Sequence, residues 1–454
     1  MATFKFWQFG CWNNLNTIDG VVQGRANDVM TFIKKKLDEL DPPDKLIISG
    51  DNYYPHKIED KKKDKSPKEE TSKKKDKSPK GEQSEKKDKS PKDETSKKLE
   101  KAPSTTKEKT IYTEVLKAGL LSLPVDIPIT MILGNHDLDR NDKKNLFVTS
   151  PSDLQSRRPE KNECEIIQLE LKAIKEKKNI DYVFFKSEFI NNETLLLMID
   201  TSIYELEKDT TTYLPCYNTF FENNPFYKDI KLRFLSIKYL RRYQYVKIQQ
   251  AINKAQRGIT TIKHVIIVGH HPIFQIKYKK TEVVPIKFTS DIHLGFKPVL
   301  KKIYNKLPKA LFYYLCSDLH LYQEGLITLK LANDKTMTIN QYIVGTGGTK
   351  LDPNLPEPEK MEKTHTAENI RYTFKREIQD HGYLECIITE GSDPTFEFIP
   401  ISVPDPVSGG RKYNSTKRIR KRMRKRKTKK YTKKHIKKYI KIKTKRKTKK
   451  YIKY

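Results

Sequence analysis

Residues 45–54 read KLIISGDNYY, a short apolar run that ends in a Gly-Asp turn. Such a run is typical of a buried parallel strand that carries a carboxylate at its C-terminal end. Open α/β sheets place their chemistry at that edge. These residues therefore predict a parallel α/β fold with Asp51 at a functional edge of the sheet.

Three later segments have the same build. They read PITMILGNHD at 128–137, HVIIVGHHP at 264–272 and LFYYLCSDLH at 311–320. Each apolar run is followed by oxygen or imidazole side chains, and several strand ends that gather such side chains can hold a pair of metal ions. The polar residues after these runs are Asn135, His136, His270, His271, Asp318 and His320.

The motifs resemble those of the calcineurin-like metallophosphoesterases, and within them most closely those of the purple (tartrate-resistant) acid phosphatases. GDNYY, GNHD and GHHP occur in the expected order, and MIDT at 198–201 and GTGGTKLD at 345–352 are similar to later blocks. The similarity extends to about Ile401 with one large interruption. It implies the family's α/β fold, a four-layer α-β-β-α sandwich.

The resemblance also implies a site for two metal ions, iron with zinc, manganese or a second iron. Asp51 matches the carboxylate that bridges the two metals. Tyr54 matches a tyrosinate on iron, with a packed aromatic ring as the alternative. The other matched metal ligands are Asn135, His270 and His320.

Two histidines match positions near the substrate. His136 matches the histidine that protonates the leaving alkoxide or holds the phosphate, so it is the predicted catalytic residue. His271 stands where the family usually has another residue, often an aromatic one. We expect it behind the metal ligands or facing the substrate.

Two residues depart from the family pattern. Cys11 occupies the position of the aspartate that follows the first strand, and Asp318 replaces the first histidine of a His-x-His motif. A thiolate binds zinc or iron, and a carboxylate can replace an imidazole. Two explanations stay open: an altered site in which Cys11 and Asp318 bind metal, or a decayed site in which Cys11 is a small buried hydrophobe.

The positive charge is concentrated in two segments. The chain has 454 residues and a net charge of +34. Residues 411–454 carry 25 Lys/Arg and no Asp/Glu, and residues 56–109 carry 20 Lys and 13 Asp/Glu, which leaves the remainder with a net charge of +2. We therefore predict a metallophosphoesterase domain over 1–405, interrupted by an insertion at 56–109, and a basic tail over 406–454.

The insertion repeats the heptapeptide KKDKSPK three times and contains no aromatic residue. Such a segment cannot bury enough apolar surface to offset the entropy of ordering, so it is predicted to be disordered. Its Ser-Pro steps resemble kinase sites. The alternative is a tolerated low-complexity expansion of a loop.

The tail intersperses tyrosines among its cations. Cations bind phosphates and tyrosines stack on bases, so residues 411–454 are predicted to bind nucleic acid or another polyanion. Residues 417–430 also resemble a nuclear-localisation cluster. A solvated tail without a specific partner is the alternative.

The cysteine count and the N-terminus bear on the cellular compartment. Five cysteines without a CxxC pair predict reduced thiols rather than a disulfide framework. Neither a signal peptide nor an apolar run of membrane-spanning length is present. We expect an intracellular protein without a membrane partner, located in the nucleus or packaged with nucleic acid.

Periodicity predicts further elements. Helices are expected at 27–40, 169–177, 239–258 and 296–307, and a variable loop at 203–235. Strands are expected at 4–9, 182–186 and 194–199, with 340–344 and 383–389 closing a sheet.

Two functions remain in competition. The first is hydrolysis of a phosphate monoester at a dinuclear metal site. The second is a catalytically impaired protein of the same fold that binds a polyanion through its tail. The sequence does not distinguish a phosphoprotein, a nucleotide or a small ester as the phosphorylated substrate.

Overall fold

A computed structural model describes most of the first 401 residues. The described residues are 2–12, 17–18, 21–22, 26–39, 41–52, 119–120, 123–138, 164–175, 177–204, 213–227, 234–257, 261–279, 282–287, 295–331, 335–356, 364–367 and 369–401. The predicted insertion, the predicted tail and Tyr54 lie outside these residues.

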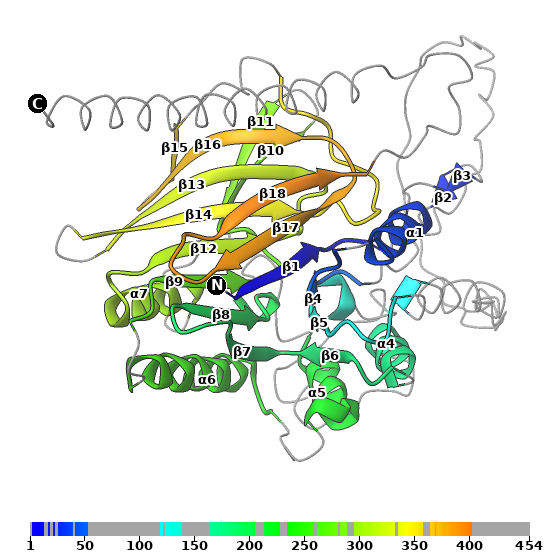
Figure 1. The fold of residues 1–454 in the computed structure, drawn as a ribbon, viewed down its shortest axis with the longest axis horizontal. Coiled ribbons are helices and arrows are strands. Elements are labelled where there is room, and N and C mark those ends of the chain that lie inside the picture. Colours follow the sequence, from blue (N-terminus) through cyan, green and yellow to red (C-terminus); the bar gives the residue numbers. More distant parts are fainter. Residues whose placement is uncertain are drawn as a thin grey trace, which may run out of the picture. The chain divides into compact units, whose positions relative to one another are not determined.

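Two large β-sheets form the centre of the fold (Figure 1). The first has six strands, which are in spatial order β18 (Thr395–Pro400), β17 (Gly382–Thr389), β1 (Thr3–Phe9), β4 (Lys45–Ser49), β5 (Ile129–Ile132) and β6 (Ile180–Val183). Strands β1, β4, β5 and β6 are parallel to one another.

The second sheet has eight strands. They are in spatial order β15 (Thr364–Ala367), β16 (Ile370–Ile378), β13 (Tyr322–Lys330), β14 (Thr336–Val344), β12 (Leu311–Cys316), β9 (His264–Val268), β8 (Thr194–Ile199) and β7 (Phe185–Phe189). Strands β8, β9, β12 and β14 are parallel. Two small hairpins pair β2 (Thr17–Ile18) with β3 (Val21–Val22) and β10 (Phe274–Lys279) with β11 (Glu282–Lys287).

Helices cover the outer faces of both sheets. Beside the first sheet lie α1 (Ala26–Leu37), α4 (Glu165–Lys175) and α5 (Leu214–Asn223), and on the second sheet lie α6 (Ile237–Arg257) and α7 (Phe296–Lys306). Three short 3-10 helices are η1 (His136–Leu138), η2 (Ser202–Tyr204) and η4 (Pro225–Tyr227). No helix in the described part of the chain combines the length and the apolar character needed to cross a membrane.

The hydrophobic core lies between the two sheets. Phe6 and Ile47 from the first sheet pack in one cluster with Leu196, Ile266 and Leu315 from the second, and all five are fully buried. Strands β4, β8 and β9 are buried along their whole length, as parallel strands covered on both faces should be. The chain therefore has the predicted α-β-β-α sandwich architecture.

Two predictions of local structure were wrong. The expected strand at 182–186 is divided between β6 and β7, which belong to different sheets, because the chain passes from one sheet to the other at Phe184. The expected loop at 203–235 contains α5, whose Tyr217 and Phe221 pack against the Phe184 ring.

Two further predictions need correction. Residues 340–344 and 383–389 do not close one sheet, because β14 and β17 lie in different sheets. The prediction of reduced thiols fails for one pair, since Cys164 and Cys216 form a disulfide. Packing of α4 on α5 brings the Cα atoms of these two cysteines to 5.2 Å from each other, although 52 residues separate them in the sequence. The free thiols are those of Cys11, Cys316 and Cys386.

Candidate metal centre

Three candidate ligands follow parallel strands in an unusual backbone conformation. Cys11, Asp51 and Asp318 have φ angles of 52°, 53° and 53°, and they are the non-glycine residues with positive φ in the described part of the chain. The left-handed region costs an L-residue about 1–2 kcal/mol. Such backbone strain is concentrated at functional sites. Here it turns all three side chains at the C-terminal ends of β1, β4 and β12.

The edges of the two sheets meet at this place. The Ser49 and Ser317 hydroxyls share a hydrogen bond of 2.5 Å across the junction. A Cβ atom on Gly10 would clash with Ser317, and one on Gly134 would clash with the Asp51 carboxylate. Glycine is therefore required at both positions because the strands approach so closely.

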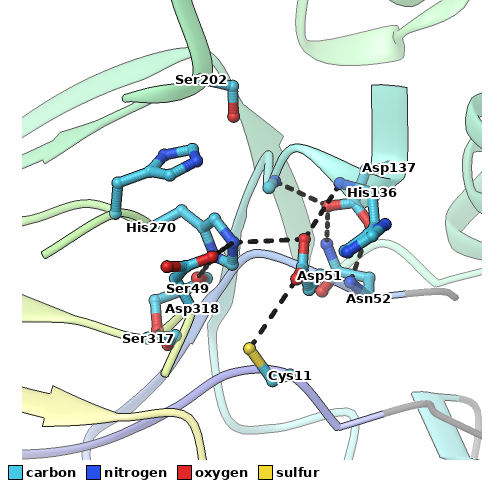
Figure 2. Close-up of polar contacts among 12 residues, drawn as sticks. Cys11, Ser49, Asp51, Asn52, His136, Asp137, Ser202, His270, Ser317 and Asp318 are labelled. Carbon is cyan, nitrogen blue, oxygen red and sulfur yellow. Dashed lines mark hydrogen bonds and ion pairs between the residues drawn. The ribbon is translucent and has the colours of Figure 1, made fainter. Parts of the chain in front are cut away.

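Asp51 is the central residue of the site. Its side chain is buried, with Cys11 Sγ 3.8 Å from Oδ2 and His270 Nε2 3.2 Å from Oδ1 (Figure 2). The backbone N–H of His136 donates to Oδ1 at 3.1 Å. The two carboxylate oxygens thus face two different donor side chains, which suits a ligand that bridges two cations.

His270 is held in the tautomer that a metal ligand needs. Its Nδ1–H donates to the Ser49 carbonyl at 2.9 Å, which directs Nε2 toward Asp51 and toward Asp318 Oδ1 at 3.9 Å. Burial lowers the pKa of His270, but the Asp51 charge and hydrogen bond outweigh burial and raise this pKa to about 10. A cation bound at Nε2 would displace that proton.

Thr201 fixes the orientation of the His271 ring. Its Oγ1 lies 3.0 Å from His271 Nδ1 and also accepts the backbone N–H groups of His270 at 3.0 Å and His271 at 2.9 Å. The His271 ring is thereby held with a ligand atom within 4.8 Å of those of His270 and Asp318.

Asp318 brings a second carboxylate to His270. Gln275 Nε2 donates to its Oδ2 at 3.1 Å. Burial raises the pKa of Asp318, but the charges of His271 and His270 outweigh it and lower the pKa below its usual value. Asp318 is therefore ionised, as a metal ligand must be.

The ligand atoms form two groups. Those of Cys11, Asp51 and His270 lie within 4.8 Å of one another, as do those of His270, His271 and Asp318. His320 belongs to neither group; its backbone N–H donates to Asp352 at 2.9 Å, and burial lowers its pKa.

Asn135 and His136, the candidate amide and imidazole groups that follow β5, lie beside Asp51. Asn135 is buried in the turn after β5, and η1 begins with His136, whose side chain is half-buried.

A buried polar network behind these residues was not anticipated from the sequence. Asp137 accepts hydrogen bonds from Gly134 N and Asn52 N at 2.7 Å and from Asn52 Nδ2 at 2.9 Å. It joins the loops that carry Asp51 and Asn135, and burial with the Asp51 charge raises its pKa to about 6. Asn52 directly follows the predicted ligand Asp51, and Asp137 directly follows the predicted catalytic residue His136. This adjacency is the signal that could have revealed them.

The donor set is compatible with metal binding. A thiol, two carboxylates and a correctly oriented imidazole converge at buried strand ends. Thiolate with imidazole and carboxylate suits zinc or iron better than magnesium or calcium. The residues present therefore fit the metals that the motifs imply, although one usual carboxylate is a thiol.

Comparison with known proteins gives a structural likeness only. No family model matches the sequence, and no curated protein matches it. Among solved structures, a purple acid phosphatase from yellow lupin (Lupinus luteus) seeds is similar, with 12% identity and a TM-score of 0.41. The match covers 88% of this chain and 52% of that one, so this chain spans about half the length of the lupin protein.

Proposed function

We propose that this chain is a metal-dependent phosphoesterase that hydrolyses phosphate monoesters at the site around Asp51. The observation that carries the proposal is the Asp51 carboxylate, with one oxygen toward Cys11 Sγ and the other toward His270 Nε2. The residues that would hold two metals, iron with zinc, manganese or iron, are Cys11, Asp51, Tyr54, Asn135, His270, Asp318 and His320.

Each group at the site would have its own role in hydrolysis. Bound metals would supply the Lewis acidity that favours attack of water on phosphorus. His136, half-buried beside Asp51, would hold the phosphate or give a proton to the leaving oxygen. His271 would face the substrate in the same site. Asp137 and Asn52 would fix the loops that carry these groups.

Elemental analysis combined with hydrolysis of p-nitrophenyl phosphate across pH tests the proposal. The full-length protein should contain two metal equivalents. Asp51→Asn should contain less metal, and its kcat should fall at least about a hundredfold, because loss of one group that stabilises the charge of the transition state lowers kcat by about two to three powers of ten. Asp126→Asn, in an exposed loop before β5, is the matched control. A metal-free, inactive wild-type protein would overturn the proposal.

A second candidate function rests on the tail. The 25 Lys/Arg of residues 411–454, without an acidic residue, support a catalytically impaired protein that binds nucleic acid or another polyanion. This candidate predicts that a chain ending at Val407 binds DNA and RNA more weakly and with less salt dependence. Equal binding by that chain would exclude it.

A further inference from the structure

The helices on the eight-stranded sheet carry charge of one sign. Helix α6 contains six Lys/Arg and α7 contains four, and neither contains Asp or Glu. Helix α4, beside the other sheet, has two Glu and two Lys. Solvated helices usually intersperse both signs in this balanced way. The α6–α7 layer is therefore strongly cationic although the domain as a whole is nearly neutral.

The cationic residues of this layer line two adjoining cavities. The smaller, of about 170 Å³, lies where Asn253 of α6 faces Lys302 and Lys306 of α7. The larger, of about 610 Å³, is lined by Lys297, Lys301, Lys302 and the β13 residue Lys330. Lys302 lines both cavities, so they lie next to each other. No acidic side chain of the described residues lines either cavity.

Three lysines of α7 have no carboxylate partner in the part of the chain that the structure describes. No ion pair joins Lys301, Lys302 or Lys306 to a carboxylate among the described residues. Like charges on adjoining cavities repel one another, and their summed field attracts anions from solution. A ligand with regularly spaced negative charges would remove this repulsion.

Aromatic and amide groups lie among the lysines. Tyr245 of α6 lines the larger cavity together with Asn305 and Asn369, and Tyr239 on the same helix is 55% exposed. Tyrosine rings stack on unpaired bases, and amides donate to base edges and phosphates. Helix α6, with 21 residues, extends over about 30 Å. An acidic peptide would satisfy the lysines but would leave the rings without stacking partners.

We propose that the α6–α7 surface, defined by Lys297, Lys301, Lys302, Lys306, Lys330 and Tyr245, binds single-stranded nucleic acid. The lysines contact consecutive phosphates, and Tyr245 stacks on a base within the larger cavity. This binding is a separate function from phosphoester hydrolysis at Asp51. It also uses residues of the folded domain, whereas the sequence had pointed only to the tail.

Fluorescence anisotropy with a labelled oligothymidylate tests the proposal on the full-length protein. The test variant replaces Lys297, Lys301, Lys302 and Lys306 with Gln. The control variant removes the same charge from exposed lysines beside the first sheet, through Gln at Lys34, Lys35, Lys172 and Lys175. Both variants keep the basic tail, so its contribution cancels in the comparison. Circular dichroism and thermal melting verify that both variants are folded.

Loss of four phosphate contacts should reduce the slope of log affinity against log salt by about 3 and weaken binding at least tenfold at low salt. The control variant should keep the wild-type slope within about 1. Equal slopes for the two variants would overturn the proposal. Tyr245→Leu should weaken binding further without changing the slope, because stacking releases no counterions.

Photocrosslinking to an oligonucleotide that carries a photoreactive base localises the contact. Crosslinked peptides should contain Tyr245 or other residues of 237–257 and 296–306. Crosslinks confined to residues 411–454 would overturn the proposal. Displacement of the oligonucleotide from the wild type by polyglutamate at equal charge concentration would also overturn it, because the occupant would then be an acidic protein.

Discussion

Cys11 is the residue on which the chemistry of the site depends most. Its thiol replaces a carboxylate, it is fully buried, and it lies 3.8 Å from Asp51 Oδ2. Asp318 supplies a carboxylate on the opposite side of His270 at 3.9 Å. One carboxylate is thus absent at position 11 and one is present at position 318, so the number of carboxylate ligands is preserved, and a thiol that ionises on a metal would add one further negative charge.

We expect Cys11→Ala to lose one of the two bound metals, measured by elemental analysis of the purified protein. X-ray absorption at the iron or zinc edge should detect a sulfur ligand at about 2.3 Å in the wild type and none in the variant. Cys316→Ala is the matched control, since Cys316 is also buried and its thiol donates a hydrogen bond to the Tyr342 carbonyl at 3.6 Å. Unchanged metal in Cys11→Ala, with gains in metal and activity in Cys11→Asp, would instead indicate a decayed site.

Asp200 has a structural role, and its contribution to the stability of the fold depends on pH. It accepts from the Tyr217 hydroxyl at 2.6 Å and from Ser202 N at 2.8 Å, and burial raises its pKa from 3.8 to about 7. The folded state therefore holds a proton that the unfolded state releases between pH 4 and pH 7. Asp200 contributes most to stability below pH 4, and this contribution is lost as the pH rises through about 7.

The free energy of unfolding of the wild type, relative to Asp200→Asn, should fall as the pH rises from 4 to 7, by about 1.4 kcal/mol per unit of pKa shift. Urea denaturation at several pH values measures it. Asp126→Asn should follow the wild-type pH dependence. Parallel curves for wild type and Asp200→Asn would contradict this expectation, because they would show that the pKa of Asp200 is the same in the folded and unfolded protein.

Local motifs explain why Asp51, His270 and Asp318 could be located from the sequence. Each follows an apolar strand directly, and parallel strands bring their ends to one edge. The role of His271 could not be predicted in this way, because the orientation of its ring depends on the Thr201 hydroxyl, 70 residues away. The position of Tyr54 stays a prediction, since it lies outside the described residues.

At the scale of elements, periodicity found α6, α7 and β8 within two residues of their observed ends. It failed at 182–186, where an uninterrupted apolar run crosses between sheets. Nothing in such a run marks the residue at which the chain changes sheets. It failed also at α5, because the aromatic residues of 203–235 suggested a variable loop, whereas Tyr217 and Phe221 pack against the Phe184 ring.

The Cys164–Cys216 disulfide ties α4 to α5 beside the first sheet. It closes a loop of 52 residues, and for a loop of this length the chain-entropy model gives a stabilisation of about 4 kcal/mol. The double variant Cys164→Ser with Cys216→Ser should therefore unfold at lower urea than the oxidised wild type. Wild type treated with a dithiol reductant should match the variant, and Cys386→Ser is the control for loss of a buried thiol. Coincident curves for oxidised wild type and double variant would contradict this expectation.

At the scale of the whole molecule, average composition concealed the distribution of charge. A net charge of +2 outside the two basic segments gave no reason to expect a cationic surface on the domain. The acids and bases are nevertheless segregated, because α6 and α7 together hold ten cations and no acid. Only the fold, which places these helices side by side on one sheet, makes the surface apparent (Figure 1).

Deletion of residues 56–109 should leave a folded domain. The segment has no aromatic residue to contribute to a core, and it joins two strands, β4 and β5, that are already paired in parallel. Shortening the connection roughly threefold reduces the entropic cost of closing it, which raises the free energy of unfolding by about 1 kcal/mol. The melting temperature should therefore stay equal or rise slightly, with metal content unchanged. A Gly/Ser segment of the original length, inserted in its place, should restore the wild-type melting temperature. A large fall on deletion that the Gly/Ser segment does not reverse would mean that the lysine-rich residues themselves pack on the domain.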